Sequence, residues 1–320
     1  MADLVSILIP VYNAEEWIAS TLRCACSQTW PNVEIIVVDD GSTDDSYEIE
    51  KGFECKYVTV VRQENQGACA ARNRALEEAQ GDYIQYLDAD DLMEADKIEA
   101  QMQCLDSAPD GAVAAARWTR FHERIGDGPH PPVPEEWEHE DPFEWLIEAQ
   151  AGRAMMPPIG WLVPRSIIEK AGPWNENLLI NQDGEYFARV LLEAEQIVFC
   201  PETTVFYRSG LPSSVSGRFS SGALQSQYEA AELITHHLLD REDTLRVRQA
   251  CADALQRVAY KAYPASKDVT HQAERRVTEL GGSNWHPPGG GMLFRWLGKR
   301  IGWKLALWLR HHYRDLRYAS

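Results

Sequence analysis

The chain has 320 residues, of which 44% are hydrophobic, and a formal net charge of −18 at pH 7. A chain of this length can bury a sizeable core, and we expect one large domain with an appendage, or two domains. The negative charge argues against general nucleic-acid binding, because most of the surface would repel a polyanion. The seven cysteines include no Cys-x-x-Cys pair, so neither a disulfide scaffold nor a zinc site is predicted.

The N-terminus enters an apolar run at once. Residues 1–4 contain neither a basic segment nor a long apolar leader. No segment reaches the roughly 18 consecutive apolar residues that a membrane-spanning helix requires. We therefore expect a cytoplasmic protein, either soluble or attached peripherally to the inner face of the membrane.

Short apolar runs alternate with helical periods as far as about residue 115. The pattern predicts strands at 5–10, 33–38, 57–61 and 82–87, and helices at 15–28, 69–79 and 96–105. Strict alternation indicates right-handed βαβ units, and hence a Rossmann-like α/β fold with a mainly parallel sheet flanked by helices. The carboxyl ends of the four strands should then meet at one edge.

The rest of the chain changes character. Residues 122–141 are rich in proline and glycine and are predicted to form a long surface loop. The pattern then predicts helices at 143–149, at 165–170 and from 181 onward, strands at 196–200 and 203–207, and helix throughout 222–280. The predicted units are an α/β domain over 1–220, a helical extension over 221–284, a Pro/Gly linker over 285–291 and a basic amphipathic helix over 292–320.

Carboxylates gather where two of the predicted strands end. Asp39 and Asp40 follow the second strand, and Asp88, Asp90 and Asp91 follow the fourth. Open α/β sheets bind ligands at this edge, and carboxylate oxygens suit Mg²⁺ or Mn²⁺ better than Zn²⁺. The alternative is an acidic turn in which Asp91 caps the following helix. These residues alone leave both interpretations open.

Four segments resemble, in order, the motif series of the family 2 inverting glycosyltransferases with the A-type fold. They are Val5–Asn13, Val37–Asp44, Gly67–Asn73 and Leu87–Asp91. The resemblance covers about residues 4–215 and extends to an acceptor-side segment at 172–178. One departure stands out, because the family usually has Glu-Asp where this chain has Gln182-Asp183.

The resemblance implies a nucleotide-sugar donor and a divalent cofactor, Mn²⁺ or Mg²⁺. Such an ion acts as a Lewis acid on the diphosphate leaving group. Asp90 is the implied metal ligand, and Asp88 is expected to contact the ribose or a metal-bound water. Arg72, with its fixed fork of donors, is expected near the diphosphate. A salt bridge from Arg72 to a nearby aspartate is the alternative.

The nucleoside is expected at the first two strand ends, at Pro10, Tyr12, Asp39 and Asp40. The ring of Tyr12 can stack on a base, and Asp40 can accept a hydrogen bond from an imide nitrogen, which favours uracil. Asp39 could serve the base or the ribose. The alternative is structural, because Asp40-Gly41 is a favourable turn dipeptide and Tyr12 is a good packing residue.

An inverting displacement needs a base that takes the proton of the acceptor hydroxyl. Asp183 is the candidate, since it lies near the start of a predicted helix, where the dipole favours the ionised carboxylate. Glu185 is a rival base, and Asp183 could instead simply cap its helix. Trp161 and Trp174 are expected either in the acceptor pocket or in the core, and Arg208 in a segment that closes over the site.

Residues 292–314 place leucine, isoleucine and tryptophan on one helical face and lysine and arginine on the other. This pattern fits a helix in the interface of an anionic membrane, where lipid-linked acceptors would be found. It fits equally a terminal helix that packs on the preceding helices and extends its cations into water.

The sequence thus favours an inverting, metal-dependent glycosyltransferase that uses a UDP-sugar to extend a polysaccharide or glycolipid. The rival hypothesis is a catalytically silent nucleotide-sugar-binding or scaffold protein of the same fold, which Gln182 favours and which the retained Asp88, Asp90 and Asp183 oppose. A nucleotidyltransferase is disfavoured, because residues 10–16 contain no glycine, lysine or arginine for a phosphate loop.

Overall fold

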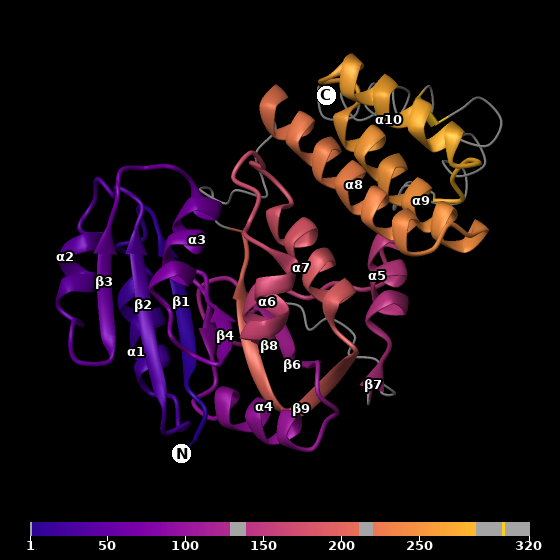
Figure 1. The fold of residues 1–320 in the computed structure, drawn as a ribbon. Helices are drawn as coiled ribbons and strands as arrows, with labels where there is room; N and C mark the ends of the chain where they lie inside the picture. Colours follow the sequence, from indigo (N-terminus) through magenta and orange to yellow (C-terminus); the bar gives the residue numbers. More distant parts are fainter. Residues whose placement is uncertain (1, 129–138, 211–219, 286–302, 305–320) are drawn as a thin grey trace.

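The computed structural model describes residues 2–128, 139–210, 220–285 and 303–304 (Figure 1). The first four strands are parallel, as predicted, and they are adjacent in the order β3-β2-β1-β4. They are β1 (Val5–Val11), β2 (Val33–Asp39), β3 (Val58–Arg62) and β4 (Tyr83–Tyr86). Every residue of β1 is buried, as expected for an apolar strand in the middle of a covered parallel sheet. The carboxyl ends of these strands therefore meet at one edge.

Helices α1 (Ile18–Cys26), α2 (Ser46–Lys51), α3 (Ala68–Glu78) and α4 (Lys97–Asp106) connect this part of the sheet. The periodicity predicts three of them. It does not predict α2, because six residues are too few to show an apolar repeat.

The second half of the sheet is mixed in direction. The order continues from β4 to β8, β6, β9 and β5, with β7 also paired to β9. Only the β6–β9 pair is parallel among these contacts of the described chain. The added strands are β5 (Leu92–Met93), β6 (Ala112–Phe121), β7 (His139–Glu140), β8 (Trp161–Pro164) and β9 (Gln196–Arg208).

The sequence does not predict β6 and β8, and it divides β9 into two strands. Four of the first five residues of β6 are alanine, which has little intrinsic preference for strands. The parallel ladder between β6 and β9 shifts register between Ala116 and Arg117, opposite the point where the sequence pattern breaks. The prediction of two strands therefore marked an irregularity within one strand.

The remaining helices cover the mixed half of the sheet and extend beyond it (Figure 1). They are α5 (Pro142–Ala151), the 3₁₀ turn η1 (Pro158–Gly160), α6 (Arg165–Ala171), α7 (Gln182–Glu193), α8 (Ser221–Arg241), α9 (Leu245–Ala262) and α10 (Lys267–Glu279). The predicted helical extension is therefore three helices, interrupted near residues 243 and 264. None of the helices in the described ranges is long and apolar enough to cross a membrane.

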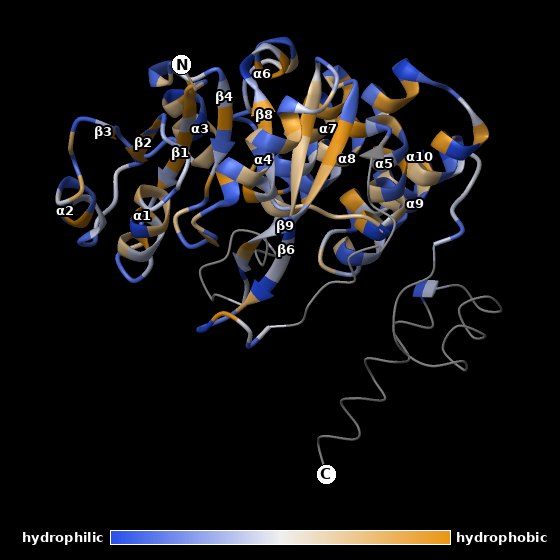
Figure 2. Cartoon of the chain, turned by 90° about the horizontal axis from the view of Figure 1, so that it is seen from below, coloured by the Kyte–Doolittle hydropathy of each residue, from blue (hydrophilic) through white to orange (hydrophobic). Residues whose placement is uncertain are grey.

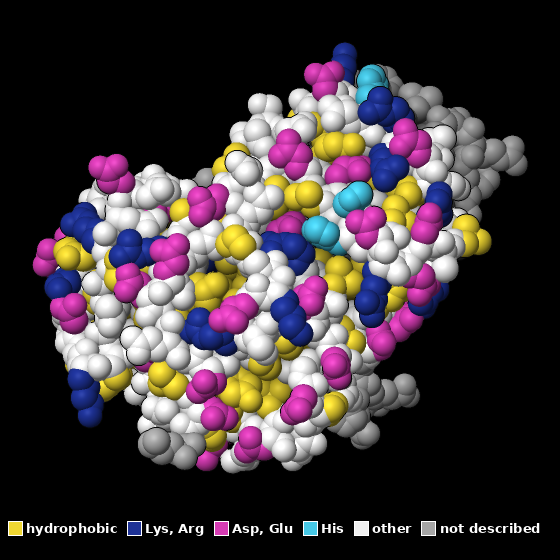
Figure 3. Space-filling model, viewed as in Figure 1, with side chains coloured by type: hydrophobic (Ala, Val, Ile, Leu, Met, Phe, Trp, Pro, Cys, Tyr) yellow, Lys and Arg dark blue, Asp and Glu magenta, His cyan; other side chains and the backbone are white. Residues whose placement is uncertain are grey.

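One hydrophobic cluster includes residues of β1, α7 and α9, so the three-helix extension shares the core of the sheet. Figure 2 shows hydrophobic residues along the central strands and hydrophilic residues at the loop tips. On the face drawn in Figure 3, acidic side chains are interspersed with lysine and arginine. The boundaries at 220 and 284 stay a prediction.

The predicted helix at 292–320 lies outside the described residues, apart from residues 303 and 304. The ring of Trp303 lies 5.7 Å from that of Tyr260 and 5.5 Å from that of Tyr263. Lys304 Nζ lies 2.6 Å from Glu274 Oε2. At these two positions the chain packs against α9 and α10.

A shared core can be tested on α9. Leu255 is fully buried, and its replacement by alanine should lower the free energy of unfolding by about 2 to 5 kcal/mol. Leu245, on the same helix, is 79% exposed, and Leu245→Ala should change that energy by less than about 0.5 kcal/mol. Urea unfolding followed by circular dichroism should show one transition, shifted as a whole by Leu255→Ala. A separate early transition for the helical extension would contradict the shared core.

Candidate active site

The acids after β4 form a turn that α1 fixes in place. The backbone N–H of Asp91 donates to the carbonyl of Asp88 at 3.1 Å. Thr21 Oγ1, on α1, lies 2.8 Å from the carbonyl oxygen of Ala89 and 3.1 Å from that of Asp91. These hydrogen bonds therefore fix the conformation of the turn.

Asp91 points into the protein, and it does not cap a helix. Its Oδ1 accepts from the backbone N–H of Arg208 at 2.7 Å, and its buried Oδ2 has no hydrogen-bond partner among the described residues. Burial, together with the charges of Asp90 and Asp88, raises its pKa well above the usual range. Helix α4 has Asp96 at its N-cap position, so the interpretation of Asp91 as a cap is wrong.

Arg208 holds this turn from β9. Its Nε donates to the carbonyl of Asp90 at 2.9 Å, and its Nη1 donates to the carbonyl of His122 at 2.6 Å. The guanidinium carbon lies 4.0 Å from the ring centre of Trp17 and 4.2 Å from that of Phe121. The sequence assigned Arg208 to an acceptor or closing segment. In the structure its Nε supports the acidic turn and its Nη1 contacts His122, while a role in closing the site stays a prediction.

Asp90 is partly buried, and its carboxyl has a raised pKa. Burial and the charge of Asp88 raise its pKa to about 6, although its own backbone N–H and Arg208 oppose the rise. A nearby cation would stabilise both carboxylates, because it would offset their repulsion.

The described residues contain no group of three or more His, Cys, Asp or Glu side chains that could hold a metal ion. Magnesium-type ions are nevertheless commonly bound by one or two carboxylates together with substrate phosphates. Asp88 and Asp90 supply two such hard oxygen ligands and repel each other in the free protein. This pair therefore fits a divalent ion that is completed by a diphosphate.

Arg72, on α3, connects the acids of β4 to those of α7. Its guanidinium is almost fully buried, and its Nη2 lies 2.7 Å from Asp88 Oδ1 and 3.9 Å from Asp183 Oδ1. Its Nη1 donates to Gln182 Oε1 at 3.3 Å. The alternative of a salt bridge thus describes the free protein, while contact with a diphosphate stays a prediction.

Asp183 lies in the first turn of α7, and 47% of its side chain is exposed. Desolvation by the surrounding protein raises its pKa to about 6, Arg72 opposes this rise, and Asp88 adds to it. Asn181 occupies the N-cap position of α7, so Asp183 is not the cap of this helix. Its carboxylate faces the cluster around Arg72.

Glu185 is turned away from that cluster. It is buried, and its Oε1 accepts from Arg189 Nε at 2.7 Å and lies 3.6 Å from His237 Nε2. Burial alone would raise its pKa, but hydrogen bonds from His237 and Arg189 outweigh burial, so the pKa is lowered. A carboxylate whose pKa is lowered in this way is a weak base and is poorly suited to accept a proton.

Asp39 and Asp40, at the end of β2, accept hydrogen bonds that stabilise the neighbouring loops. Asp40 accepts hydrogen bonds from Gln63 Nε2 at 2.8 Å, from the N–H of Gln66 at 2.9 Å and from the N–H of Gly67 at 2.7 Å. It thereby fixes the start of α3, the helix that carries Arg72. A further hydrogen bond, which Asp40 would accept from the base of a nucleotide, stays a prediction.

Asp39 is fully buried, accepts from the N–H of Ser42 at 3.2 Å and pairs with Arg62 Nε at 3.2 Å. Pro10 lies buried within β1, whereas Tyr12, just beyond this strand, is 50% exposed. Tyr12 therefore has the accessible ring that stacking on a base requires.

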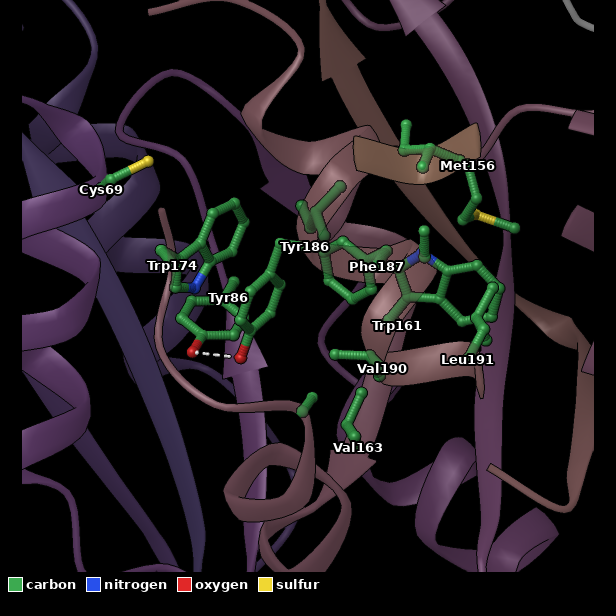
Figure 4. Packing of buried hydrophobic residues seen from close by; sticks show 14 of the residues in the cluster. Cys69, Tyr86, Met156, Trp161, Val163, Trp174, Tyr186, Phe187, Val190 and Leu191 are labelled. Atoms are coloured by element: carbon green, nitrogen blue, oxygen red, sulfur yellow. Dashed lines mark hydrogen bonds between the residues drawn. The ribbon is translucent and has the colours of Figure 1, made fainter. Parts of the chain in front are cut away.

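Trp161 and Trp174 are core residues, so neither offers an open ring face to a sugar. Both are at most 2% exposed. Trp161 packs between Trp145 and Phe187, with ring centres at 5.4 and 5.8 Å, and Trp174 stacks on Tyr186 at 3.9 Å (Figure 4). The prediction of an acceptor pocket lined by these two rings is therefore wrong.

Tyr207 is a site residue to which sequence reasoning gave no role of its own. Its pKa is raised to about 12, first by burial and then by four surrounding carboxylates, those of Asp91, Asp88, Asp183 and Asp90. No local motif signals it, because β9 reaches the site through long-range pairing.

Residues 6–172, about half of the chain, match the family model described as glycosyl transferase family 2. The chain belongs to this family. The glycosyltransferase GlyG of Streptococcus pneumoniae is 30% identical over 216 residues, which are 65% of this chain and 71% of GlyG. An Escherichia coli protein named UDP-Glc:alpha-D-GlcNAc-diphosphoundecaprenol beta-1,3-glucosyltransferase WfaP is 41% identical over 106 residues, or 33% of this chain and 42% of WfaP.

An uncharacterized glycosyltransferase of Haemophilus influenzae is 46% identical over 102 residues, which span only 31% of this chain and 41% of that protein. Among solved structures, residues 1–349 of S. aureus TarS in complex with UDP-GlcNAc align with a TM-score of 0.69 at 19% identity. This alignment covers 86% of this chain and 81% of that chain. It confirms the glycosyltransferase A-type fold with a helical C-terminal region.

Glu50 is a buried carboxyl whose pKa is affected by Asp39, and it should make the folding stability depend on pH. Glu50, on α2, is fully buried, and neither oxygen has a hydrogen-bond partner among the described residues. Burial, and then the charges of Asp39 and Asp44, raise its pKa from 4.5 to about 8, against the opposing charge of Arg62. The folded protein thus binds more protons than the unfolded chain between these values, so this group makes stability fall as pH rises.

Glu50→Gln should remove this loss, and the variant should be more stable than the unsubstituted protein at pH 8. Glu48→Gln is the matched control, because Glu48 is exposed on the same helix. Urea unfolding at pH 5 and pH 8 measures both effects. An equal pH dependence with and without Glu50 would show that its carboxyl titrates normally.

Proposed function

We propose that the protein transfers a sugar from a nucleotide sugar, a UDP-sugar, to a hydroxyl acceptor with inversion, in polysaccharide or glycolipid synthesis. The observation that carries this proposal is the position of Arg72, 2.7 Å from Asp88 and 3.9 Å from Asp183. One buried guanidinium thereby connects the proposed donor side with the proposed base. Membership of family 2 supplies the class of reaction.

The uridine donor is supported by two comparisons. The name of the E. coli relative specifies UDP-Glc and a diphosphoundecaprenol acceptor, and the S. aureus neighbour was solved with UDP-GlcNAc. In this chain, exposed Tyr12 would stack on the base, while buried Asp39, paired with half-exposed Arg62, ends the neighbouring strand. A lipid-linked acceptor is the class that the E. coli relative favours here.

Asp90 and Asp88 would hold a divalent ion, Mn²⁺ or Mg²⁺, which would neutralise the negative charge of the departing diphosphate. Arg72 would supply a second positive charge on the same side. Asp183 would take the proton of the acceptor hydroxyl as its oxygen bonds to the anomeric carbon. The bond from that carbon to the phosphate oxygen breaks, and its electrons leave with the nucleotide. A pKa of about 6 leaves Asp183 mostly ionised at neutral pH.

The catalytically silent alternative rests on Gln182. Its Oε1 accepts from Arg72, and its Nε2 donates to the carbonyl of Leu178 at 2.7 Å. The amide therefore has a defined structural role, and this role does not replace the carboxylate of Asp183. The presence of Asp183 in the same cluster favours the enzyme.

The base can be tested by Asp183→Asn with Mn²⁺ and a panel of nucleotide sugars and acceptors. We expect kcat to fall by about 10²- to 10⁴-fold, because the acceptor hydroxyl loses its proton acceptor. Donor binding should change little. Glu193→Gln is the control, since Glu193 is exposed near the other end of the same helix. Nucleotide diphosphate release that is unchanged by Asp183→Asn would remove the assignment.

The metal site can be tested separately by thermal shift with UDP, GDP, dTDP and CDP, each with and without Mn²⁺. UDP should stabilise the protein most, and Mn²⁺ should enhance this effect, since only the folded site binds the pair. Asp90→Asn should abolish the enhancement, whereas Asp110→Asn, an exposed control, should retain it. An equal enhancement in both variants would place the ion elsewhere.

A further inference from the structure

The ring of Trp174 lies against the guanidinium of Arg72. The guanidinium carbon is 4.5 Å from the ring centre, which is within cation–π range. Both side chains are buried, so water does not compete for the contact. Besides this ring, Arg72 contacts Asp88, Asp183 and Gln182, and its buried Nε has no hydrogen-bond partner among the described residues. No hydrogen bond at Nε therefore fixes the plane of the guanidinium.

Trp174 is itself held by the residue next to Arg72. Asn73, on α3, accepts at Oδ1 from the backbone N–H of Trp174 at 2.8 Å and donates through Nδ2 to its carbonyl at 3.0 Å. Both backbone groups of Trp174 are thus attached to α3. Residues 72 and 73 act on the same tryptophan, one on its ring and the other on its backbone.

The same ring is attached to α7, the helix of Asp183. Trp174 stacks on Tyr186 with ring centres 3.9 Å apart and planes 9° apart, and the ring centre of Tyr86 lies 5.1 Å away with its plane at 81° (Figure 4). Arg189, one turn further along α7, donates through Nη2 to the carbonyl of Pro173 at 2.9 Å. Trp174 therefore lies between the helix that carries Arg72 and the helix that carries Asp183.

We propose that Trp174 is a positioning residue, whose ring holds the Arg72 guanidinium between Asp88 and Asp183. Without the ring, only the hydrogen bond from Arg72 Nη1 to Gln182 would oppose full pairing of Arg72 with one carboxylate, and the spacing of the two acids would change. A misplacement of about 1 Å can cost a reaction roughly 10²-fold. The catalytic consequence rests on the proposed function, whereas the geometry does not.

A double-mutant cycle tests whether Trp174 acts through Arg72. Trp174→Leu should lower kcat/KM about tenfold in the unsubstituted protein, but less than about twofold in the Arg72→Met background. Trp174→Phe, which keeps a ring, should lose less than about threefold. Trp161→Leu, a buried tryptophan without contact to Arg72, should have the same effect in both backgrounds. A loss from Trp174→Leu that is equal in the two backgrounds would overturn the proposal.

A second readout does not depend on turnover. In the free protein, the Nε–Hε order parameter of Arg72 should resemble that of rigid backbone, about 0.85, and should fall below about 0.6 in Trp174→Leu. An unchanged order parameter would overturn the proposal even if transfer is observed. Conversely, a fall without any detectable transfer would support Trp174 while refuting the proposed function. Should Trp174→Leu not fold, Asn73→Ala should show the same loss of order.

Discussion

The site depends on one buried cation shared by carboxylates from two parts of the chain. Arg72 is buried, and an unpaired guanidinium in that position would be strongly destabilising. Asp88 and Asp183 would in turn repel each other without it. Each group therefore requires the others, which explains why the edge of the parallel sheet and the start of α7 meet.

The carboxylates around Arg72 differ in the hydrogen bonds and ion pairs that the rest of the protein makes to them. Asp40 accepts hydrogen bonds that shape the start of α3, and Glu185 pairs with Arg189 on α7, so both serve the scaffold. Asp90 and Asp183 retain raised pKa values and partial access to solvent. Carboxylates whose environments push their pKa values apart commonly take different roles in a reaction. The division here separates the residues that build the site from those that could bind an ion or move a proton.

Local patterns predicted the parallel half of the sheet and the acids at its edge, because period, turn and motif lie within a few residues of each other. They failed where contacts between distant segments decide the outcome. The alanine-rich start of β6 becomes a strand only between β8 and β9. Arg208 and Tyr207 reach the acids through the pairing of β9, and Trp174 meets Arg72 from about 100 residues away. No spacing within the sequence reveals such contacts.

The most direct test of a shared cleft is anomalous diffraction from crystals grown with UDP and Mn²⁺. We expect one manganese peak beside Asp90 and Asp88, next to the diphosphate of the bound nucleotide, with Asp183 facing the same bound nucleotide. A manganese peak away from Asp88 and Asp90, or a nucleotide bound outside the region that Arg72 and Asp183 share, would contradict it.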